Sequence, residues 1–324
     1  MRQKCLKKFQ DLKFETFGKY ILSSVPFFYL GLPVKILFLK KTFHFCNPYS
    51  FIYMLAISGL YIYPIKSLAG IEVKEAQLTG RGFQHDRRWM LVDNENRFLT
   101  QREFSQMALL QVGLAIDGLV VSHKINGNNI HIPFLPESTE TGIVTVWDST
   151  CIGQFVSNAA DIWFTSMLGK PCRLVYMPDT STIPVDTGYA KHDEITSFSD
   201  GYPFLLVGQA SLDDLNSRLS EPLPINRFRP NIVFTGGGPF LEDRMAHFTI
   251  GQNHFYGVKL CGRCPITTIN QDTATKSKEP LKTLATYRSK NNKVYFGQNL
   301  LHKGEGLLRV GDIINVLAEK EGLA

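Results

Sequence analysis

The stretch Val258-Lys-Leu-Cys261-Gly-Arg-Cys264-Pro-Ile-Thr-Thr-Ile-Asn-Gln-Asp272-Thr273 joins two thiols, an arginine between them and a polar tail. A guanidinium near a cysteine favours the thiolate, which is the nucleophilic and metal-binding form of that side chain. The β-branched run at 266–269 predicts an extended strand after the second cysteine. A redox Cys-X-X-Cys normally opens a helix, so the dithiol-exchange interpretation lacks its usual scaffold here.

Other interpretations of the cysteine pair remain open at this point. His247 and His254 precede the pair and would complete a tetrahedral zinc set, although their spacing fits no familiar zinc-finger pattern. The two thiols would otherwise form a disulfide, or pack as small half-buried apolar groups. Simple packing does not explain the arginine between the cysteines or the polar tail after them.

Composition is that of an ordinary soluble enzyme. The 324 residues can bury one large core or two moderate ones. A net charge of +6, without a nucleic-acid motif, argues against nucleic acid as a partner. Six cysteines in a chain of this length do not form a disulfide framework, and no Asn-X-Ser/Thr acceptor occurs. We therefore expect a reducing compartment and a cytoplasmic location.

The first part of the chain after residue 54 shows short strand patterns. Alternating residues at 60–65 predict a strand that delivers Lys66 and Ser67 to a turn ending near Gly70. A hairpin is expected between 87–92 and 98–102, across a turn-rich tetrapeptide. Further short strands follow up to residue 133, with a turn at Asn126-Gly127. This half is expected to be predominantly β and barrel-like.

The later part mixes helices and strands. Apolar residues at helical spacing predict a helix over 154–168 that ends at Gly169, and Ser211 is the expected N-cap of a second helix reaching 219. Strands are expected at 172–176 and 202–207, separated by a polar stretch that would be a substrate-side loop or a domain seam. Residues 307–316 predict a closing strand pair. The predicted fold class is α+β, predominantly β.

Four phrases occur in an order that resembles one known family. They are Tyr63-Pro-Ile-Lys-Ser67, Asp86-Arg-Arg-Trp89, Arg227-Phe-Arg-Pro-Asn231 and the cysteine segment at 261–272. Together they resemble MOSC-domain proteins, and most of all the branch with the mitochondrial amidoxime-reducing component and its bacterial relatives. The resemblance runs from about residue 55 to about residue 316. It implies a MOSC N-terminal β-barrel domain at 54–177 and a MOSC β-barrel domain at 178–324, with a few peripheral helices.

The same resemblance implies a molybdenum cofactor, molybdopterin, whose metal is bound by the second cysteine, Cys264. A metal already held by a dithiolene needs one soft anionic ligand from the protein, and a thiolate supplies it. The pterin ends in a phosphate, which suits arginine, lysine and hydroxyl or backbone donors. The matching cofactor-binding positions are Lys66, Ser67, Arg87, Ser199, Arg227, Arg229, Gly262, Arg263 and Asn299.

Each of these positions also has a plainer interpretation. Arg87 and Arg88 are neighbours on one expected strand, so they face opposite ways and one of them would be a surface charge. Lys66 would cap a turn, and Arg227 would pair with a nearby carboxylate. Asp272 would orient the cysteine loop through Asx-type bonds.

Two other positions match the family less closely. Asn299 stands where the mitochondrial members have Tyr, which leaves the detailed cofactor contacts open. Ser199, with Asp200 beside it, matches a polar stretch facing phosphate or pterin only loosely.

The leading functional hypothesis is a molybdenum-dependent oxidoreductase that reduces N-hydroxylated compounds such as amidoximes and hydroxylamines, with Cys264 as catalytic metal ligand. The ferredoxin domain of some bacterial relatives lacks a counterpart here, so a separate cytochrome b5-like or ferredoxin-type protein is the expected electron donor. Alternatives are a sulfur carrier with a persulfide on Cys264, and a non-catalytic protein that binds and carries the cofactor.

Residues 1–53 differ from the rest. Five lysines lead into an apolar and aromatic run at 20–39, which has about the length of a membrane span but contains Pro26, Pro33 and Lys35. The segment is either a signal anchor, which would bring membrane contact, or an extension without a fold of its own. We favour the second, because Met54 falls immediately before the first family phrase.

Overall fold

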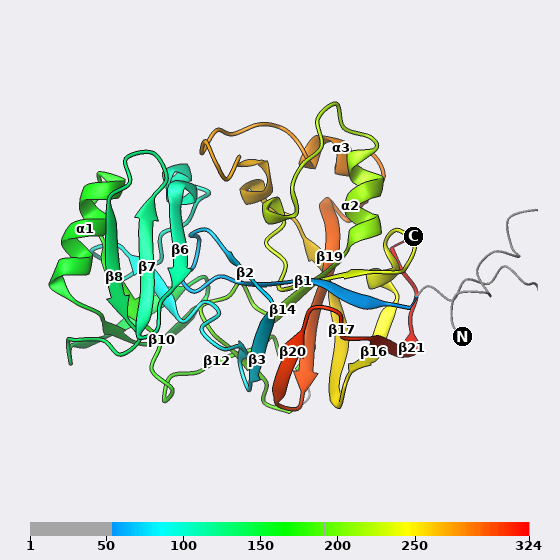
Figure 1. Ribbon diagram of the computed structural model, residues 1–324, viewed down its shortest axis with the longest axis horizontal. Helices are drawn as coiled ribbons and strands as arrows, with labels where there is room; N and C mark the ends of the chain where they lie inside the picture. The colour runs from blue at the N-terminus through cyan, green and yellow to red at the C-terminus, as the bar shows by residue number, and fades with distance from the viewer. Residues whose placement is uncertain (1–53, 191, 324) are drawn as a thin grey trace, which may run out of the picture. The chain divides into compact units, whose positions relative to one another are not determined.

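β-Strands dominate the part of the chain that the computed structural model describes, residues 54–190 and 192–323 (Figure 1). Three short α-helices and four single 3-10 turns accompany the strands in this part. The predicted class, α+β and predominantly β, is confirmed. The expectation of an anchor or an extension at residues 1–53 lies outside the described residues.

The largest sheet combines strands from both ends of the described chain. Its order is β2-β1-β15-β14-β19-β17-β16-β21, with β18 added to β19, and the pair β14–β15 is parallel. The bounds of these strands are β1 Ala56–Ile62, β2 Ile71–Val73, β14 Phe204–Gly208, β15 Ile232–Thr235, β16 Met245–Ile250, β17 Asn253–Gly262, β18 Ser289–Lys290, β19 Lys293–Lys303 and β21 Ile314–Glu319. Strand β1 therefore reaches its partner β15 only across a long sequence separation.

A small sheet repeats this long-range pairing. It consists of β3 (Glu75–Thr79), β4 (Gly82–Phe83) and β20 (Gly306–Arg309), in the order β20-β3-β4. Two strands are present near 307–316 as expected, but they do not pair with each other, because β20 pairs with β3 while β21 pairs with β16. Partner choice over such distances leaves no local trace in the sequence. The division into domains at 177–178 stays a prediction.

Three further sheets are built from the first half and the middle of the chain. Two of them have the orders β5-β11-β10-β9 and β6-β7-β8, and the third is the pair β12–β13. Their bounds are β5 Trp89–Val92, β6 Leu110–Leu114, β7 Gly118–His123, β8 Asn129–Pro133, β9 Thr141–Val146, β10 Ser149–Phe155, β11 Arg173–Tyr176, β12 Ile183–Pro184 and β13 Ile195–Thr196. The hairpin expected after β5 shrinks to a single bridge between Val92 and Phe98.

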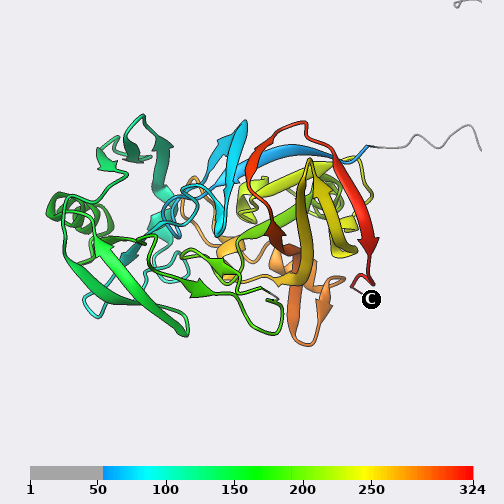
Figure 2. The same ribbon diagram turned by 90° about the horizontal axis from the view of Figure 1, so that it is seen from below.

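The helices are short and begin where their caps allow. Helix α1 (Asn158–Leu168) is capped by Ser157, whose side chain accepts from the Ala160 amide, and it ends at Gly169 with φ of 63°. The expected start at 154 was too early, because those residues belong to β10. Figure 2 shows α1 and the strands β6 to β8 far from β16 and β21.

No helix in residues 54–190 and 192–323 is long and apolar enough to span a membrane.

Helix α2 (Gln209–Asn216) corrects a second expectation. It begins after Gly208, so Ser211 is an interior residue rather than the N-cap. The buried Ser211 hydroxyl donates to Glu242 Oε2 at 2.8 Å, a partner that only the fold supplies. Helix α3 spans Leu281–Ala285, with Pro280 at its N-cap.

Buried apolar side chains form four groups. The first joins side chains from residues 57–83 to side chains from residues 204–314, across the long-range sheets. Two further groups belong to residues 65–198, and the fourth lies among residues 205–296. In the fourth, Phe228 stacks on Phe296 with ring centroids 4.1 Å apart, which fixes the segment that carries Arg227 and Arg229.

Candidate functional site

Lys66 is buried immediately after the β1 segment. Its side chain is 5% exposed, and its ammonium donates to the Phe198 carbonyl at 2.7 Å and pairs with Asp200. Burial lowers the pKa of Lys66, and Asp200 opposes that shift. A buried ammonium needs this kind of partner to stay charged. Lys66 therefore does more than cap a turn.

Asp200 collects several donors, although sequence reasoning gave it only a loose match. Its carboxylate accepts from Arg102 Nη2 at 3.2 Å and from the Trp147 indole N–H at 3.1 Å, in addition to Lys66. Partial burial by itself would raise the pKa of Asp200, but Lys66 and Arg102 outweigh it and hold the pKa below the ordinary value. Arg102 and Trp147 belong to this cluster and were missed, because neither lies in a family phrase.

Arg87 and Arg229 lie on the same aromatic ring. Their guanidinium carbons are 4.2 and 4.3 Å from the centroid of Tyr63, which is 1% exposed. Arg87 donates to Asp86 Oδ2 at 2.5 Å and to Asn231 Oδ1 at 3.0 Å. Such cation–π contacts hold two like charges close together in a fixed geometry.

Arg229 is bound to a main-chain oxygen rather than to a carboxylate. Its Nη1 donates to the Leu68 carbonyl at 2.6 Å. Burial lowers the pKa of Arg229 to about 10, which still leaves it charged at neutral pH. The structure thus presents a positive charge that the carbonyl orients and does not neutralise.

Three of the candidate residues have left-handed backbones without being glycine. The φ angles are 67° at Ser67, 50° at Arg87 and 55° at Arg229. This region costs a side-chain-bearing residue on the order of 1 kcal/mol and recurs at ligand-binding positions. Arg87 and Arg88 precede β5, so the expectation that they are neighbours on one strand is wrong.

The cysteine loop departs from the expected strand. Strand β17 ends at Gly262, and residues Pro265–Thr268 form a 3-10 turn with Cys264 at its N-cap. The Thr267 and Thr268 hydroxyls donate back to the carbonyls of Cys264 and Pro265, at 3.0 and 2.7 Å. These bonds satisfy the backbone locally and override the β preference of the run.

The arginine between the two cysteines, Arg263, contacts the sulfur of the first one, Cys261. Arg263 Nη1 lies 3.0 Å from Cys261 Sγ, and its Nη2 donates to the Phe228 carbonyl at 2.8 Å. Cys264 is half-buried, and both cysteines are free thiols. Arg263 therefore ties the cysteine loop to the segment of Arg227 and Arg229. Its guanidinium contacts the sulfur of Cys261, the first cysteine.

Further hydrogen bonds join the remaining phrases around the cysteine loop. Arg227 donates to two main-chain carbonyls, from Nε to Thr267 at 2.8 Å and from Nη2 to Glu279 at 3.3 Å, rather than pairing with a carboxylate as its plainer interpretation expected. Gln271 Nε2 donates to Gln101 Oε1 at 3.1 Å, and Gln101 Nε2 donates to the Ser67 carbonyl at 2.6 Å. The two buried glutamines thus link the loop to the Lys66–Ser67 turn. No motif pointed to them.

Three other candidates lie on β19, just before β14 and at the end of β17. Asn299 is half-buried on β19, in register with Leu205 and Lys259. Ser199 donates to the Tyr202 carbonyl at 2.9 Å, and Gly262 is exposed at the end of β17.

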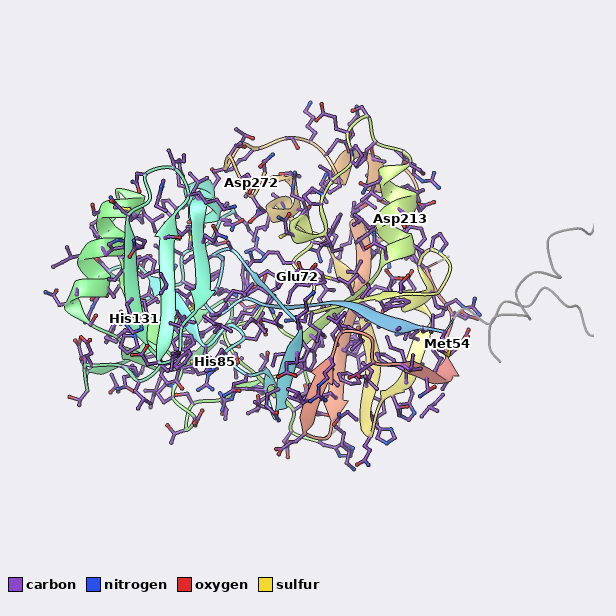
Figure 3. The ribbon with its side chains drawn as sticks, viewed as in Figure 1. Met54, Glu72, His85, His131, Asp213 and Asp272 are labelled. Atoms are coloured by element: carbon purple, nitrogen blue, oxygen red, sulfur yellow. The ribbon has the colours of Figure 1, made fainter. Side chains whose placement is uncertain are left out.

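Asp272 has a different role from the one expected. The Asx-type bonds in this loop are made by Asn270, whose side chain accepts from the Asp272 amide at 2.8 Å. The Asp272 carboxylate, labelled in Figure 3, instead receives Lys124 Nζ at 2.7 Å. This pair ties the loop to the first half of the chain.

The zinc interpretation lacks a ligand cluster. His247 Nε2 lies 2.9 Å from His254 Nδ1, so the two imidazoles hydrogen-bond to each other. Among the residues that the structure describes, no three His, Cys, Asp or Glu side chains gather as metal ligands. The cysteine pair is also not a disulfide.

Comparison with known families matches both parts of the described chain. Residues 54–171 match the MOSC N-terminal beta barrel domain, and residues 193–315 match the MOSC domain. The chain therefore belongs to the MOSC-domain family.

Three individual proteins are similar to this chain over most of its length. Mitochondrial amidoxime-reducing component 1 of Mus musculus is 32% identical over 282 residues, which cover 81% of this chain and 82% of that protein. The Homo sapiens protein of the same name is 32% identical over 281 residues, covering 81% and 83%. Molybdenum cofactor sulfurase of Oryza sativa subsp. japonica is 31% identical over 261 residues, covering 74% of this chain but only 32% of the sulfurase.

Proposed function

We propose that this protein binds molybdopterin, with Cys264 as the thiolate ligand of molybdenum, and reduces N-hydroxylated compounds such as amidoximes and hydroxylamines. The names of these relatives support both the cofactor and the reaction. The observation that carries the proposal is the pair of guanidinium groups on Tyr63, in a region hydrogen-bonded to the loop of Cys264.

The donor set fits an anionic pterin. Lys66, Arg87 and Arg229 supply cationic donors, and Arg229 is held by a carbonyl, so its charge is available to a phosphate. Planar guanidinium groups match phosphate oxygens in a bidentate way, and the ammonium acts as a point charge. Binding would exchange the Asp200–Lys66 contact for a contact with the ligand, at least in part.

Molybdenum, once bound, supplies the two-electron chemistry, and this chain supplies the surroundings. Cys264 would offer the soft anionic ligand that the metal prefers. Arg263 holds the loop of Cys264 against the Phe228 carbonyl, and the buried glutamines Gln101 and Gln271 hold its other side. The half-buried Asn299 would offer amide donors and acceptors toward the pterin or the substrate.

Electrons would come from a separate protein of the cytochrome b5 or ferredoxin type. Amidoxime reduction consumes two electrons and two protons and releases water, so each turnover needs a donor.

A second candidate function has its own support. The molybdenum cofactor sulfurase of rice matches 74% of this chain, so a sulfur carrier with a persulfide on Cys264 is the main competitor. A non-catalytic carrier of the cofactor would use the same basic groups without reducing a substrate.

One experiment separates the three candidates. The protein is purified from a host that makes the cofactor, and molybdenum content, sulfane sulfur and benzamidoxime reduction with an artificial donor are measured together. Stoichiometric metal with reduction supports the proposal, metal without reduction favours carriage, and labile sulfur without metal favours the sulfur carrier.

Matched cysteine variants test the assigned ligand. Cys264→Ala is expected to abolish metal retention, whereas Cys261→Ala, three residues away, is expected to keep it. The reverse result would assign the metal to the thiol that Arg263 contacts.

A further inference from the structure

A cavity lies beside the segment that carries Arg87. Its volume is about 480 Å³, and none of the candidate cofactor residues lines it. Arg87 turns to Tyr63 and Asn231, whereas its neighbour Arg88 donates to the Tyr176 hydroxyl at 2.9 Å and lines the cavity. Arg87 and Arg88 are consecutive in the chain, but Arg87 lies on Tyr63 and Arg88 lines the cavity.

Aromatic rings form much of the cavity wall. His85, labelled in Figure 3, stacks on Phe134 with centroids 4.3 Å apart and an interplanar angle of 9°. Trp89 and Tyr176 form a second pair, with centroids 5.1 Å apart. Flat apolar walls of this kind favour a planar ligand.

The polar groups without a partner here are both donors. Trp89 is 1% exposed, and its indole N–H has no hydrogen-bond partner. Arg88 Nε is buried and unpartnered as well. Indole and guanidinium N–H groups donate and never accept, so a ligand that reached them would have to supply acceptor oxygens.

The cavity also has an excess of positive charge. Arg81 and Arg88 both line it. The one acidic lining residue, Asp179, has a side chain 84% exposed and pairs with Arg88 Nη2 at 2.7 Å, so the excess charge lies on Arg81. Arg81 donates to the carbonyls of Ser181 and Asp179 at 2.9 and 3.0 Å, which orients its charge without neutralising it. Burial and then Arg88 lower the pKa of Arg81, and the same two causes lower the pKa of His85.

We propose that this cavity binds a small aromatic carboxylate, with its ring against the aromatic wall and its carboxylate on Arg81, beside the Trp89 indole N–H. A carboxylate provides the acceptor oxygens and the negative charge that the site lacks, and a guanidinium binds it with two parallel bonds. The site is separate from the cofactor region, so it stands or falls independently of the proposed reaction.

The indole N–H resonances of the full-length protein test the site directly, with benzoate as the probe. The chain has three tryptophans, and Trp147→Phe and Trp163→Phe assign the resonance of Trp89. Benzoate is expected to move the Trp89 resonance in a saturable way. Movement of Trp147 alone would place benzoate near Asp200 in the basic region instead, and no movement of Trp89 would also overturn the proposal.

Variants and ligand analogues then test each part of the recognition. Arg81→Gln is expected to weaken benzoate binding about tenfold, because a charge-assisted contact is lost. Arg97→Gln is the matched control, since the Arg97 side chain is 69% exposed and pairs with Glu95; it should leave the affinity unchanged.

Benzamide, which lacks the charge, and acetate, which lacks the ring, should each bind about tenfold more weakly than benzoate. Equal affinity for acetate would overturn the aromatic part of the proposal. Equal affinity for benzamide, or an Arg81→Gln variant that binds benzoate normally, would overturn the ionic part.

Discussion

Arg173 and Arg229 are arginines of one protein used in opposite ways. Arg173 is partly exposed and bonds to both oxygens of Glu140, at 2.7 and 2.8 Å, and to Asp161 at 2.9 Å. Arg229 is oriented by the Leu68 carbonyl and lies against Tyr63. Glu140 raises the pKa of Arg173, whereas burial lowers that of Arg229. The first charge is neutralised by two carboxylates, whereas the second is oriented by a carbonyl, as the proposed function requires of a group that binds an anion.

The largest effect is expected at a third kind of arginine, which is buried and fully paired. Arg288 Nη2 lies 2.6 Å from Asp243 Oδ2, and the two side chains are 6% and 2% exposed. Arg288→Gln leaves a buried carboxylate without its cation and should lower the free energy of unfolding by roughly 3–5 kcal/mol. Urea denaturation measures it, and a loss below about 1 kcal/mol would contradict a structural role for the pair.

Glu242 is the acidic counterpart of these arginines, a buried carboxyl group that forms no ion pair in the described part of the chain. Burial raises the pKa of Glu242 from 4.5 to about 7. Between these values the unfolded chain ionises while the folded one stays protonated, so stability falls as pH rises. The total fall is roughly 3 kcal/mol, essentially complete once pH exceeds 7.

Glu242→Gln should remove most of this pH dependence in urea unfolding. Glu75→Gln, at a side chain 57% exposed, is the control and should leave the wild-type slope in place. If the stability of the Glu242→Gln variant followed pH in parallel with that of the wild type, Glu242 would ionise normally in the folded protein.

Arg229→Gln tests the charge kept for a ligand, and it rests on the proposed function. We expect molybdopterin affinity to fall roughly hundredfold, because a buried charge-assisted contact is lost. Thermal stability should stay the same or rise, since Arg229 and Arg87 repel each other across Tyr63. Metal content and melting temperature measured on the same sample check both outcomes; a large loss of stability with unchanged metal would reverse the assignment.

Arg173→Gln should give the smallest effect. Partly exposed ion pairs contribute little, so the free energy of unfolding should drop by about 0.5–1 kcal/mol. Metal content should not change. If this variant loses the metal as readily as Arg229→Gln does, the two arginines do not differ in the way described.

Local signals in the sequence predicted part of the fold. Gly169 ended its helix as expected, because a left-handed residue stops an α-helix. The 3-10 turn after Cys264 was missed, since two threonine hydroxyls outweigh a β-branched preference. Ser211 was misassigned because its partner, Glu242, lies 31 residues away.

The candidate site was less accessible to local reasoning. Family phrases pointed to Lys66, Arg87 and Arg229, and the structure places Arg87 and Arg229 on one ring. The residues that hold the phrases together, Gln101 and Gln271, carry no motif. Their role depends on burial and on pairing over 170 residues, which no periodicity encodes.

The pairing of β1 with β15, and of β3 with β20, has a consequence for biosynthesis. Strands β1 and β3 leave the ribosome long before their partners β15 and β20 are translated. Until then, the edges of these early strands have no hydrogen-bond partner strand. Such edges invite association with other chains and with chaperones. Complementary fragments cut between β13 and β14 should therefore recombine when mixed, because each holds strands that the other one lacks.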